Sequence, residues 1–544
     1  MKGGAIQHES SDQGNGPASI QCTASYCSGK LIATWLSDRL WKPDFMAIPR
    51  GAAYIGRLMR ALLIGLCGTL TFSGALLAQC PDGTPPPCRG AARGPVPNTV
   101  AVLPFENRAR DTTLTLLAEG LADQITTNLG QVQRLALMPP ASVRFVLGQT
   151  PRDPERLARA LDCRWLVDGQ LLQARGSVRV SVQLIDAVSR HVRWSSVFQR
   201  PTEDLFAVIS GVADSVATAI IGTLAPAERA RLARRPTTSN AALIAYARGV
   251  AALHRYDEVH VRLAATEFAN AVAADSLFAR AWAGLSEALA WQDFWVPPRQ
   301  LMPRARAAAQ RALALDPQSS DALAALAAVA QNYDWDPARA DSLARRALSR
   351  DSTNARAWLY LGDALLAEHR ADEGVAAYHA ALAADTLDEQ VAIEASNGLH
   401  IAHRTDEALA VVRRWRRLLP QSANWDFAQA LILTGAHRCS SSPPANPIGP
   451  IALACAGHAD AARAIADTMV AQVERGEYYV PPGVLAWIFI GMGDRESTLR
   501  WFARAVEART WLVALAPVDP IWDPLRDDPR FAELLRRIRP LEAR

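Results

Sequence analysis

Two histidines and two cysteines lie near each other in the second half of the 544-residue chain, as His437-x-Cys439 and Cys455-x-x-His458. Thiolate and imidazole groups bind zinc tetrahedrally, although this spacing matches no familiar zinc module. The second interpretation is a Cys439–Cys455 disulfide stapling the loop 440–450 between two helices, and closing such a loop is worth about 3 kcal/mol in the chain-entropy model. The third interpretation is a pair of unpaired core cysteines. We expect the disulfide and no metal.

Other groups that could do chemistry are isolated. His400 and His403 stand three residues apart on an expected helix, but no carboxylate or cysteine nearby in the sequence completes a metal site. The chain contains no GxxxxGKS/T phosphate loop, no GxGxxG after a strand, no GxSxG elbow and no HExxH pair. We therefore expect no catalytic residues, no cofactor and no enzyme activity.

The charge distribution argues against a nucleic-acid partner. The chain has 58 Lys/Arg and 54 Asp/Glu, which gives a formal net charge of +4. The basic excess lies in the first 60 residues, so acidic and basic residues nearly balance in 79–544. Proteins that bind nucleic acid concentrate Lys and Arg on one face. We expect no nucleic-acid partner.

An uncharged apolar run, Ala61–Ala78, follows Arg57 and Arg60. If translation begins at an internal methionine, the run is the core of a secretory signal cleaved between Ala78 and Gln79. If it begins at the first residue, the run is a short membrane anchor whose basic flank stays in the cytoplasm. We favour the cleaved signal.

Both interpretations export the rest of the chain, to the periplasm or cell envelope, with membrane contact only through residues 61–78 if they are uncleaved. Cys80 and Cys88 follow in CPDGTPPPC, and in an oxidising compartment we expect them to close a short disulfide loop. A lipid on Cys80 is disfavoured because Gln79 precedes it, where bacterial lipoprotein signals need a small residue. Two free thiols in a flexible leader are the other alternative.

Residues 99–224 have the patterning of a compact α+β unit. Apolar runs and alternation predict strands, whereas leucines at helical spacing predict helices. Polar Glu106-Asn107 should end the first strand, and Arg175-Gly176 reads as a hairpin turn. The expected elements are strands at 99–105, 165–172, 178–184 and 192–198, and helices at 114–129 and 203–224.

Six segments of this unit occur in one unbroken order and resemble the TolB amino-terminal-like family, which is related to FlgO-type domains. The resemblance implies a mixed sheet covered by helices, without catalytic residues. It also implies an arrangement in which this domain precedes tetratricopeptide repeats, often beside a kinase, cyclase or winged-helix module, none of which is visible in this sequence. The segments are AVLPFEN (101–107), AEGLADQITTNL (118–129), RWLVDGQL (164–171), VRVSVQLIDA (178–187), VRW (192–194) and DLFAVISGVADSVATAI (204–220).

Four aspartates mark a repeat in the second half. Asp275, Asp316, Asp351 and Asp385 each follow an alanine by four residues and a small residue by eleven. The last three are 35 and 34 residues apart, which is the period of a helix-turn-helix repeat. Such a unit cannot bury its apolar face alone, so we expect neighbouring units to stack into a solenoid with a concave binding surface.

The segment Ala357–Thr386 resembles the tetratricopeptide family. Small residues there let two helices approach closely, and large ones fill the space between them. Weaker copies lie at 404–420 and around Thr498, Phe502 and Ala505, and residues 511–544 resemble the carboxy-terminal cap of such arrays. The matching positions are Trp358, Leu361, Gly362, Leu365, Gly374, Tyr378 and Ala381.

The expected fold class is an α+β amino-terminal domain, a mixed sheet with helices, followed by an all-α tetratricopeptide-type solenoid. Trp291 and Trp295, in an expected long connection over 291–303, are candidate partner contacts, unless they pack against the α+β domain. The expected order is a poorly structured tail or mis-assigned start (1–58), signal or anchor (59–78), leader (79–98), α+β domain (99–224), linker (225–240), repeats (241–510) and cap (511–544).

These features predict an exported, non-catalytic scaffold of the cell envelope that binds an unidentified protein or peptide segment. The alternative is the extracytoplasmic sensor portion of a membrane-anchored signalling system.

Overall fold

The computed structural model describes residues 98–108, 113–174, 176–201, 204–420, 422–439 and 449–538. The predicted signal segment 61–78, its cleavage site at Ala78 and Gln79, and the pair Cys80 and Cys88 therefore lie outside the described residues. Among the helices that are described, none combines the length and apolar character needed to cross a membrane.

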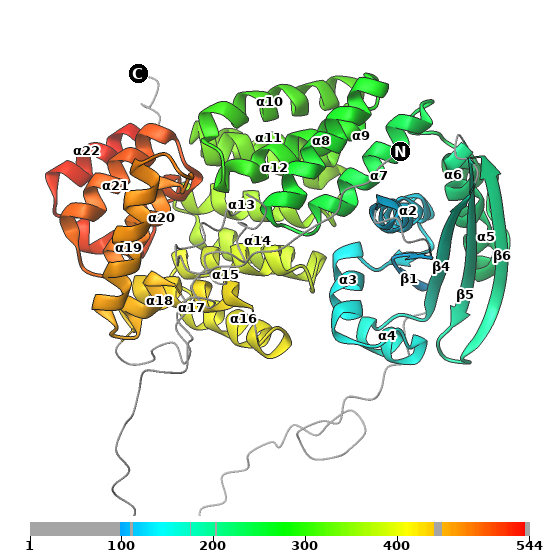
Figure 1. Ribbon diagram of the computed structural model, residues 1–544, viewed down its shortest axis with the longest axis horizontal. Helices are drawn as coiled ribbons and strands as arrows, with labels where there is room; N and C mark the ends of the chain where they lie inside the picture. The colour runs from blue at the N-terminus through cyan, green and yellow to red at the C-terminus, as the bar shows by residue number, and fades with distance from the viewer. Residues whose placement is uncertain are drawn as a thin grey trace, which may run out of the picture.

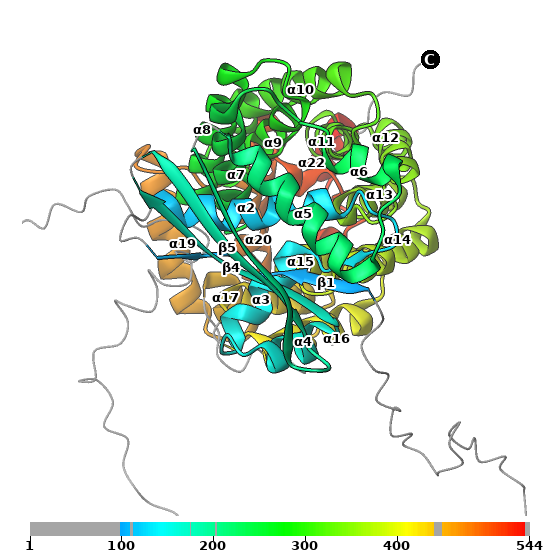
Figure 2. The ribbon, with the colours of Figure 1, turned by 90° about the vertical axis from the view of Figure 1, so that its right-hand side faces the viewer.

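The amino-terminal unit is built on a mixed sheet with the main strand order β3-β1-β4-β5-β6 (Figures 1 and 2). β1 (Thr99–Val102) pairs in parallel with β3 (Ala136–Leu137) and with β4 (Trp165–Ala174). β4, β5 (Ser177–Asp186) and β6 (His191–Pro201) form an antiparallel meander. The three long strands lie where the sequence predicts them.

The first strand is shorter than its sequence predicts, and the expectation that Glu106-Asn107 ends it is wrong. These two residues form β2 (Glu106–Asn107), which pairs in parallel with β4. Pro104 between β1 and β2 has no N–H to donate, so the ladder is interrupted there and resumes beyond it.

Helices cover both faces of the sheet. α2 (Thr113–Leu129) and α5 (Leu205–Ile221) share a core with the apolar alternate residues of β5. α3 (Pro140–Gln149) and α4 (Pro154–Leu161), which the sequence did not reveal, pack on Leu103 and Leu166 of the other face. The unit is therefore three-layered at its centre.

The expected linker 225–240 contains a packed helix, α6 (Pro226–Leu232). Proline suits the first turn of a helix because its missing N–H would have no intrahelical partner. Leu232 is buried, and the Glu228 carboxylate accepts from the backbone N–H of Ala225 at 2.8 Å and from Arg134 at 2.7 Å. The segment is thus part of the α+β unit's surface.

The rest of the chain forms a curved stack of antiparallel helix pairs, of the tetratricopeptide type (Figure 1). Five pairs come first, and then α17 (Ala423–Gly435), two further pairs and the cap. The pairs are α7 (Asn240–Leu253) with α8 (Glu258–Ala274), α9 (Ala279–Ala290) with α10 (Pro298–Leu315), α11 (Ser320–Val329) with α12 (Pro337–Arg350), α13 (Ala355–Ala367) with α14 (Ala371–Ala384), α15 (Glu389–Ile401) with α16 (Thr405–Leu418), α18 (Pro450–Cys455) with α19 (Ala459–Glu474), and α20 (Pro482–Gly491) with α21 (Arg495–Ala508).

The four repeated aspartates end the second helix of four successive pairs. Asp275, Asp316, Asp351 and Asp385 are the C-caps of α8, α10, α12 and α14. Each donates its backbone N–H to the alanine four residues earlier, and its carboxylate accepts from the N–H two residues later. Such turns redirect the chain into the next first helix. The spacing therefore reflects turn chemistry.

Tyr378 shows how the helices of the repeat fit together. Its ring is fully buried, and an added Cβ at Gly362 in α13 or Gly398 in α15 would lie 2.6 Å or 2.2 Å from it. Its hydroxyl donates to Asp363 at 2.7 Å. Without side chains at the two glycines, both first helices pack directly on the ring.

The α+β unit joins the stack without a gap. α2 packs on α7 so closely that an added Cβ at Gly120 would lie 2.0 Å from the carbonyl oxygen of Ala247. Arg255 at the end of α7 pairs with Glu119 of α2 at 2.9 Å. In Figure 1, α2 lies between the sheet and α7. The unit therefore serves as the first layer of the array.

Candidate protein-binding surface

Side chains from distant helix pairs meet on the inner face of the array. The hydroxyl of Tyr256, between α7 and α8, lies 3.4 Å from the Asp388 carboxylate at the start of α15, across 132 residues of sequence. Arg356 in α13 donates to the same hydroxyl and pairs through Nε with Glu287 of α9 at 2.8 Å. Contacts that skip whole helix pairs require the stack to curl tightly.

We call the side chains that meet on this face the inner cluster. Its members face one another either by direct contact or through electrostatic interaction. It comprises Tyr256, Glu287, Trp291, Asp293, Arg356, Tyr360, Asp363, Asp388 and Glu394.

Arg356 is fixed at the centre of the cluster. Its guanidinium carbon lies 5.0 Å from the Trp291 ring centroid and 5.6 Å from that of Tyr256, and the two rings are 5.2 Å apart. Cation–π contacts of this kind add to the ion pair with Glu287. One carboxylate, one phenol and two rings thus hold this cation.

Among the described residues, the other carboxylates of the cluster form no direct ion pair, although Arg356 acts electrostatically on Glu394 and Asp388. Asp363 accepts from Tyr378, and Asp388 caps α15 by accepting from the N–H groups of Gln390 and Val391. Glu394 forms no hydrogen bond or ion pair with any residue that the structure describes. Within the described ranges, Glu287 is therefore the one carboxylate of the cluster that contacts an arginine directly.

Burial of these carboxyl groups favours their neutral form. It raises the pKa of Glu394 to about 8, and neighbouring Asp363 and Asp388 raise it further while Arg356 opposes them. Burial likewise raises the pKa of Asp363 to about 6 and the pKa of Asp293 well above its ordinary value, with Glu394 contributing to the latter. A carboxyl that ionises reluctantly gains most when a cation arrives.

Trp291 was predicted from the sequence as a candidate partner contact, whereas none of the carboxylates of the cluster was. The expected connection over 291–303 is shorter in the structure, because a 3-10 helix, η2 (Trp291–Phe294), is followed after three residues by α10, which includes Pro303. Trp291 and Trp295 are half-buried against α7 and α8, so they line the array. Their contacts therefore correspond only in part to either interpretation of the sequence.

The start and end of the array touch each other. The rings of Phe294 and Trp511 are 5.4 Å apart, and Arg299 of α10 donates through both Nε and Nη2 to the Glu507 carbonyl in α21, at 2.9 Å and 2.6 Å. The Arg509 guanidinium lies 4.5 Å from the Trp335 ring centroid. These contacts bring η2, α10 and Trp335 against α21 and the segment that follows it.

The α+β unit contacts the array at a second place through α3. The Ser142 hydroxyl donates to Asp385 at 2.9 Å, and the Phe145 and Trp415 rings meet edge to face at 5.1 Å. Burial raises the pKa of Asp385 to about 6. The repeat aspartate after α14 therefore also serves as a docking point between the two units.

Of the two cysteines and two histidines around residues 437–458, the cysteines form a cross-link. The structure joins Cys439, after α17, to Cys455 of α18 by a disulfide with a Cα–Cα distance of 4.9 Å. His437 and His458 lie in the flanking turns. Over the described ranges, no three or more His, Cys, Asp or Glu are arranged to hold a metal ion.

The histidine pair in α15 and the turn after it serves the packing. His400 is buried, and its Nδ1 lies 3.1 Å from the Thr405 hydroxyl. A Cβ added at Gly435 would lie 2.4 Å from the Nε2 of His400. His403 occupies the left-handed turn after α15, with a φ of +60°. The two rings therefore have different surroundings.

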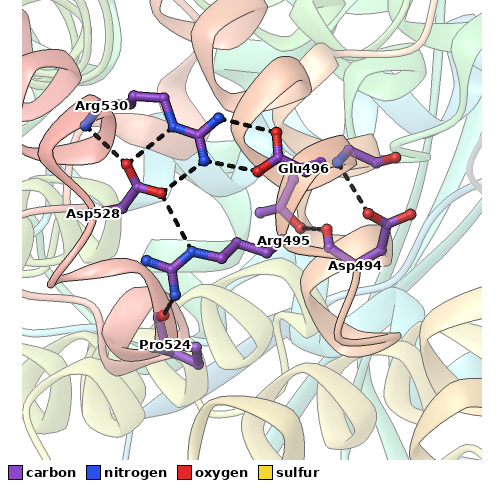
Figure 3. A network of polar contacts seen from close by, with 8 residues as sticks. Asp494, Arg495, Glu496, Pro524, Asp528 and Arg530 are labelled. Atoms are coloured by element: carbon purple, nitrogen blue, oxygen red, sulfur yellow. Dashed lines mark hydrogen bonds and ion pairs between the residues drawn. The ribbon is translucent and has the colours of Figure 1, made fainter.

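The cap is built from paired charges (Figure 3). The Asp528 carboxylate accepts from Arg495 at 3.3 Å and from Arg530, which also reaches Glu496 at 2.7 Å. Arg495 donates in addition to the Pro524 carbonyl at 2.8 Å. Hydrogen bonds from Arg530 lower the pKa of both carboxyl groups. The network joins η5 (Pro520–Leu525) and α22 (Pro529–Ile538) to α21.

No family model matches the chain. A protein of Rhizobium meliloti (strain 1021) named "Putative adenylate cyclase 3" is 30% identical over 137 residues, which make up 25% of this chain and 23% of that protein. The chain thus spans about a quarter of this curated relative.

Similar solved structures match parts of the chain. TolB from Acinetobacter baumannii is 19% identical, covers 25% of this chain and 31% of its own, and has a TM-score of 0.18. Pseudomonas aeruginosa pilF is 20% identical, covers 46% and 97%, and has a TM-score of 0.26. A tetratricopeptide repeat protein from Parabacteroides merdae is 11% identical, covers 55% and 99%, and has a TM-score of 0.29. Scores this low support no inference about function.

Proposed function

We propose that this protein is a non-catalytic scaffold of the cell envelope that binds an extended segment of another polypeptide on the inner face of its helical array. The observation that carries the proposal is the inner cluster, a part-exposed polar and aromatic surface to which α9, α13 and α15 all contribute. Stacked helix pairs commonly use such concave surfaces for recognition.

The amino-terminal unit supports the envelope location. Its six motif segments resemble the TolB amino-terminal-like family, and the apolar run 61–78 has the composition of an export signal. In this proposal the TolB-like domain is the first layer of the array and a docking unit of the envelope, and it performs no chemistry.

Site-specific photo-crosslinking in the organism that makes the protein tests the proposal. A benzophenone amino acid replaces Trp295, which directly follows the η2 residues of the inner cluster, in one variant, and Leu277, which is 68% exposed in the turn after α8, in the control variant. We expect a discrete protein adduct from position 295 and none from position 277. Equal adducts at both positions, or none at 295, would contradict the proposal.

A second function, the sensor portion of an anchored signalling protein, is favoured by the partial match to a protein named as an adenylate cyclase. The amino terminus of the mature protein separates the two. A terminus at Gln79 supports the released scaffold, whereas retention of residues 61–78 in the membrane fraction supports the sensor.

A further inference from the structure

Asp293 is a buried carboxyl group of the array whose side chain lacks a hydrogen-bonding or ion-pairing partner among the described residues. It lies in η2 and is 6% exposed. Within the part of the chain that the structure describes, its side chain has neither a hydrogen bond nor an ion pair. Burying an ionisable group without a partner costs several kcal/mol or forces it to stay neutral. Because the burial of Asp293 without a described partner does not stabilise the fold, this carboxyl group is a candidate for a role in binding.

The groups around Asp293 place it toward the interior of the array. It interacts electrostatically with Glu394 of α15 and with Tyr479 before α20, which belong to other turns of the stack. The Tyr479 hydroxyl is itself buried and without a hydrogen-bond partner. Three polar groups from three separate parts of the array therefore face a common region with unused hydrogen-bonding capacity.

Arg356, the cation of the inner cluster, acts on Glu394 only electrostatically and is not among the groups that act on Asp293. Arg356 directs its Nε to Glu287 at 2.8 Å, and its ring contacts are with Trp291 and Tyr256. It nevertheless shows what this environment accepts, because one carboxylate and two aromatic rings suffice to hold a guanidinium here. Asp293 and Glu394 are two further carboxyl groups that form no ion pair with a described residue.

The acidic character of these side chains and their distribution over several helices disfavour two classes of ligand, anions and metal ions. Phosphates and other anions are disfavoured because any of Asp293, Asp363, Asp388 and Glu394 repels an anion once it is ionised. A metal ion needs three or more ligands around one point, and the described residues contain no such group. Carboxylates that are distributed along a surface instead suit the cationic side chains of a bound polypeptide.

We propose that Asp293 and Glu394 bind the side chain of a lysine or arginine within the polypeptide that occupies the inner face. This inference rests on the proposed function and specifies its partner: the bound segment is basic at this position. Ionised Asp293 and Glu394 would hold the cation from two sides, and the Tyr479 hydroxyl is placed to take part in the contact.

The test uses the full-length protein and a library of 12-residue peptides with random flanks and one fixed central residue. That residue is lysine, arginine, norleucine or glutamate in four separate pools. We expect the lysine and arginine pools to bind at least about tenfold more tightly than the norleucine pool, and the glutamate pool to bind most weakly. Fluorescence anisotropy of labelled pools gives the affinities.

Isosteric variants assign the preference to its residues. Asp293→Asn and Glu394→Gln should each remove most of the lysine-over-norleucine preference while leaving norleucine binding within about twofold. Asp372→Asn, an exposed carboxylate of α14 that pairs with Arg404, is the matched control and should change neither pool. Circular dichroism melting of each variant verifies that it is folded.

The possible failures are distinguishable. If peptides bind equally well whatever their central residue, or if both variants keep the preference, the inference is wrong while the proposed function stands. If spermidine binds and no pool does, the site takes a free polyamine and the inference is overturned. If neither binds, the proposed function falls with it.

Discussion

The cap and the inner cluster treat their carboxylates in opposite ways. In the cap, Asp528 and Glu496 each bond to arginines, and their pKa values are lowered (Figure 3). In the inner cluster, Asp293 and Glu394 form no ion pair with a described residue, and burial raises their pKa values, an effect that Arg356 offsets only in part at Glu394. The chain has arginines throughout its second half, so the absence of a partner at these two positions is a specific property of the inner face.

The two kinds of carboxylate should therefore have opposite effects on the stability of the protein. A paired carboxylate contributes to stability, and its loss should loosen the structure. A buried, unpaired carboxylate opposes folding, and neutralising it should stabilise the protein at the expense of binding. Of the four substitutions below, the first tests the packing of the helices that carry the inner cluster, and the other three test this distinction.

Gly398→Ala should have the largest effect. Its Cβ would lie 2.2 Å from the Tyr378 ring, which is enclosed by helices and cannot move away, so we expect a loss of about 3 kcal/mol in urea unfolding. Gly148→Ala in α3 is the control, since nothing lies within 4 Å of its Cβ, and it should stabilise slightly. Equal effects of the two changes would mean that the close packing around Tyr378 is not what fixes α15.

Asp528→Asn should release the cap. The amide cannot accept the charge-assisted hydrogen bonds from both Arg530 and Arg495, so α22 should exchange its amide hydrogens faster and be cut sooner by protease. Asp527→Asn changes the neighbouring, exposed carboxylate and should have no such effect. Unchanged protection of α22 in the first variant would show that the charge network does not secure the cap.

Glu394→Gln should stabilise the protein, and the effect should depend on pH. Its folded pKa of about 8 lies above the ordinary 4.5, so the folded state retains a proton that the unfolded state releases, and wild-type stability falls as pH rises between these values. The two proteins should be equally stable at pH 4, and the variant should be more stable by on the order of 1–3 kcal/mol at pH 8. Urea unfolding at both pH values checks this, and parallel pH profiles would refute it.

Asp372→Asn should have the smallest effect. Its carboxylate is 92% exposed in its ion pair with Arg404, and such surface pairs change stability by less than about 0.5 kcal/mol. A thermal melt measures the difference. A loss as large as that of Gly398→Ala would show that exposure is a poor guide to which charges hold this fold.

The sequence predicted the features that repeat or alternate. Alanines before the capping aspartates and the glycines around Tyr378 follow from local packing and turn chemistry, so the helix pairs could be expected. Alternation located β5 and β6 for the same reason. By contrast, α3, α4 and α6 are short and begin with proline, which resembles loop sequence when read alone.

The candidate site could not be predicted in the same way. Glu287, Arg356 and Glu394 look like ordinary charges on helix surfaces in the sequence, and what unites them is the curl that brings Tyr256 to Asp388. That curl is the sum of small rotations over several pairs. No local pattern records it. Trp291 was identified because a tryptophan near a turn is conspicuous by itself.

Hydrogen–deuterium exchange of the full chain, with and without the tightest-binding lysine-centred peptide, tests the central claim most directly. If the inner face binds polypeptide, α9, η2, α13 and α15 should gain protection, while the second helices α10, α12 and α14 and the cap remain unchanged. Protection confined to the second helices or to the cap, or no change anywhere, would contradict the account.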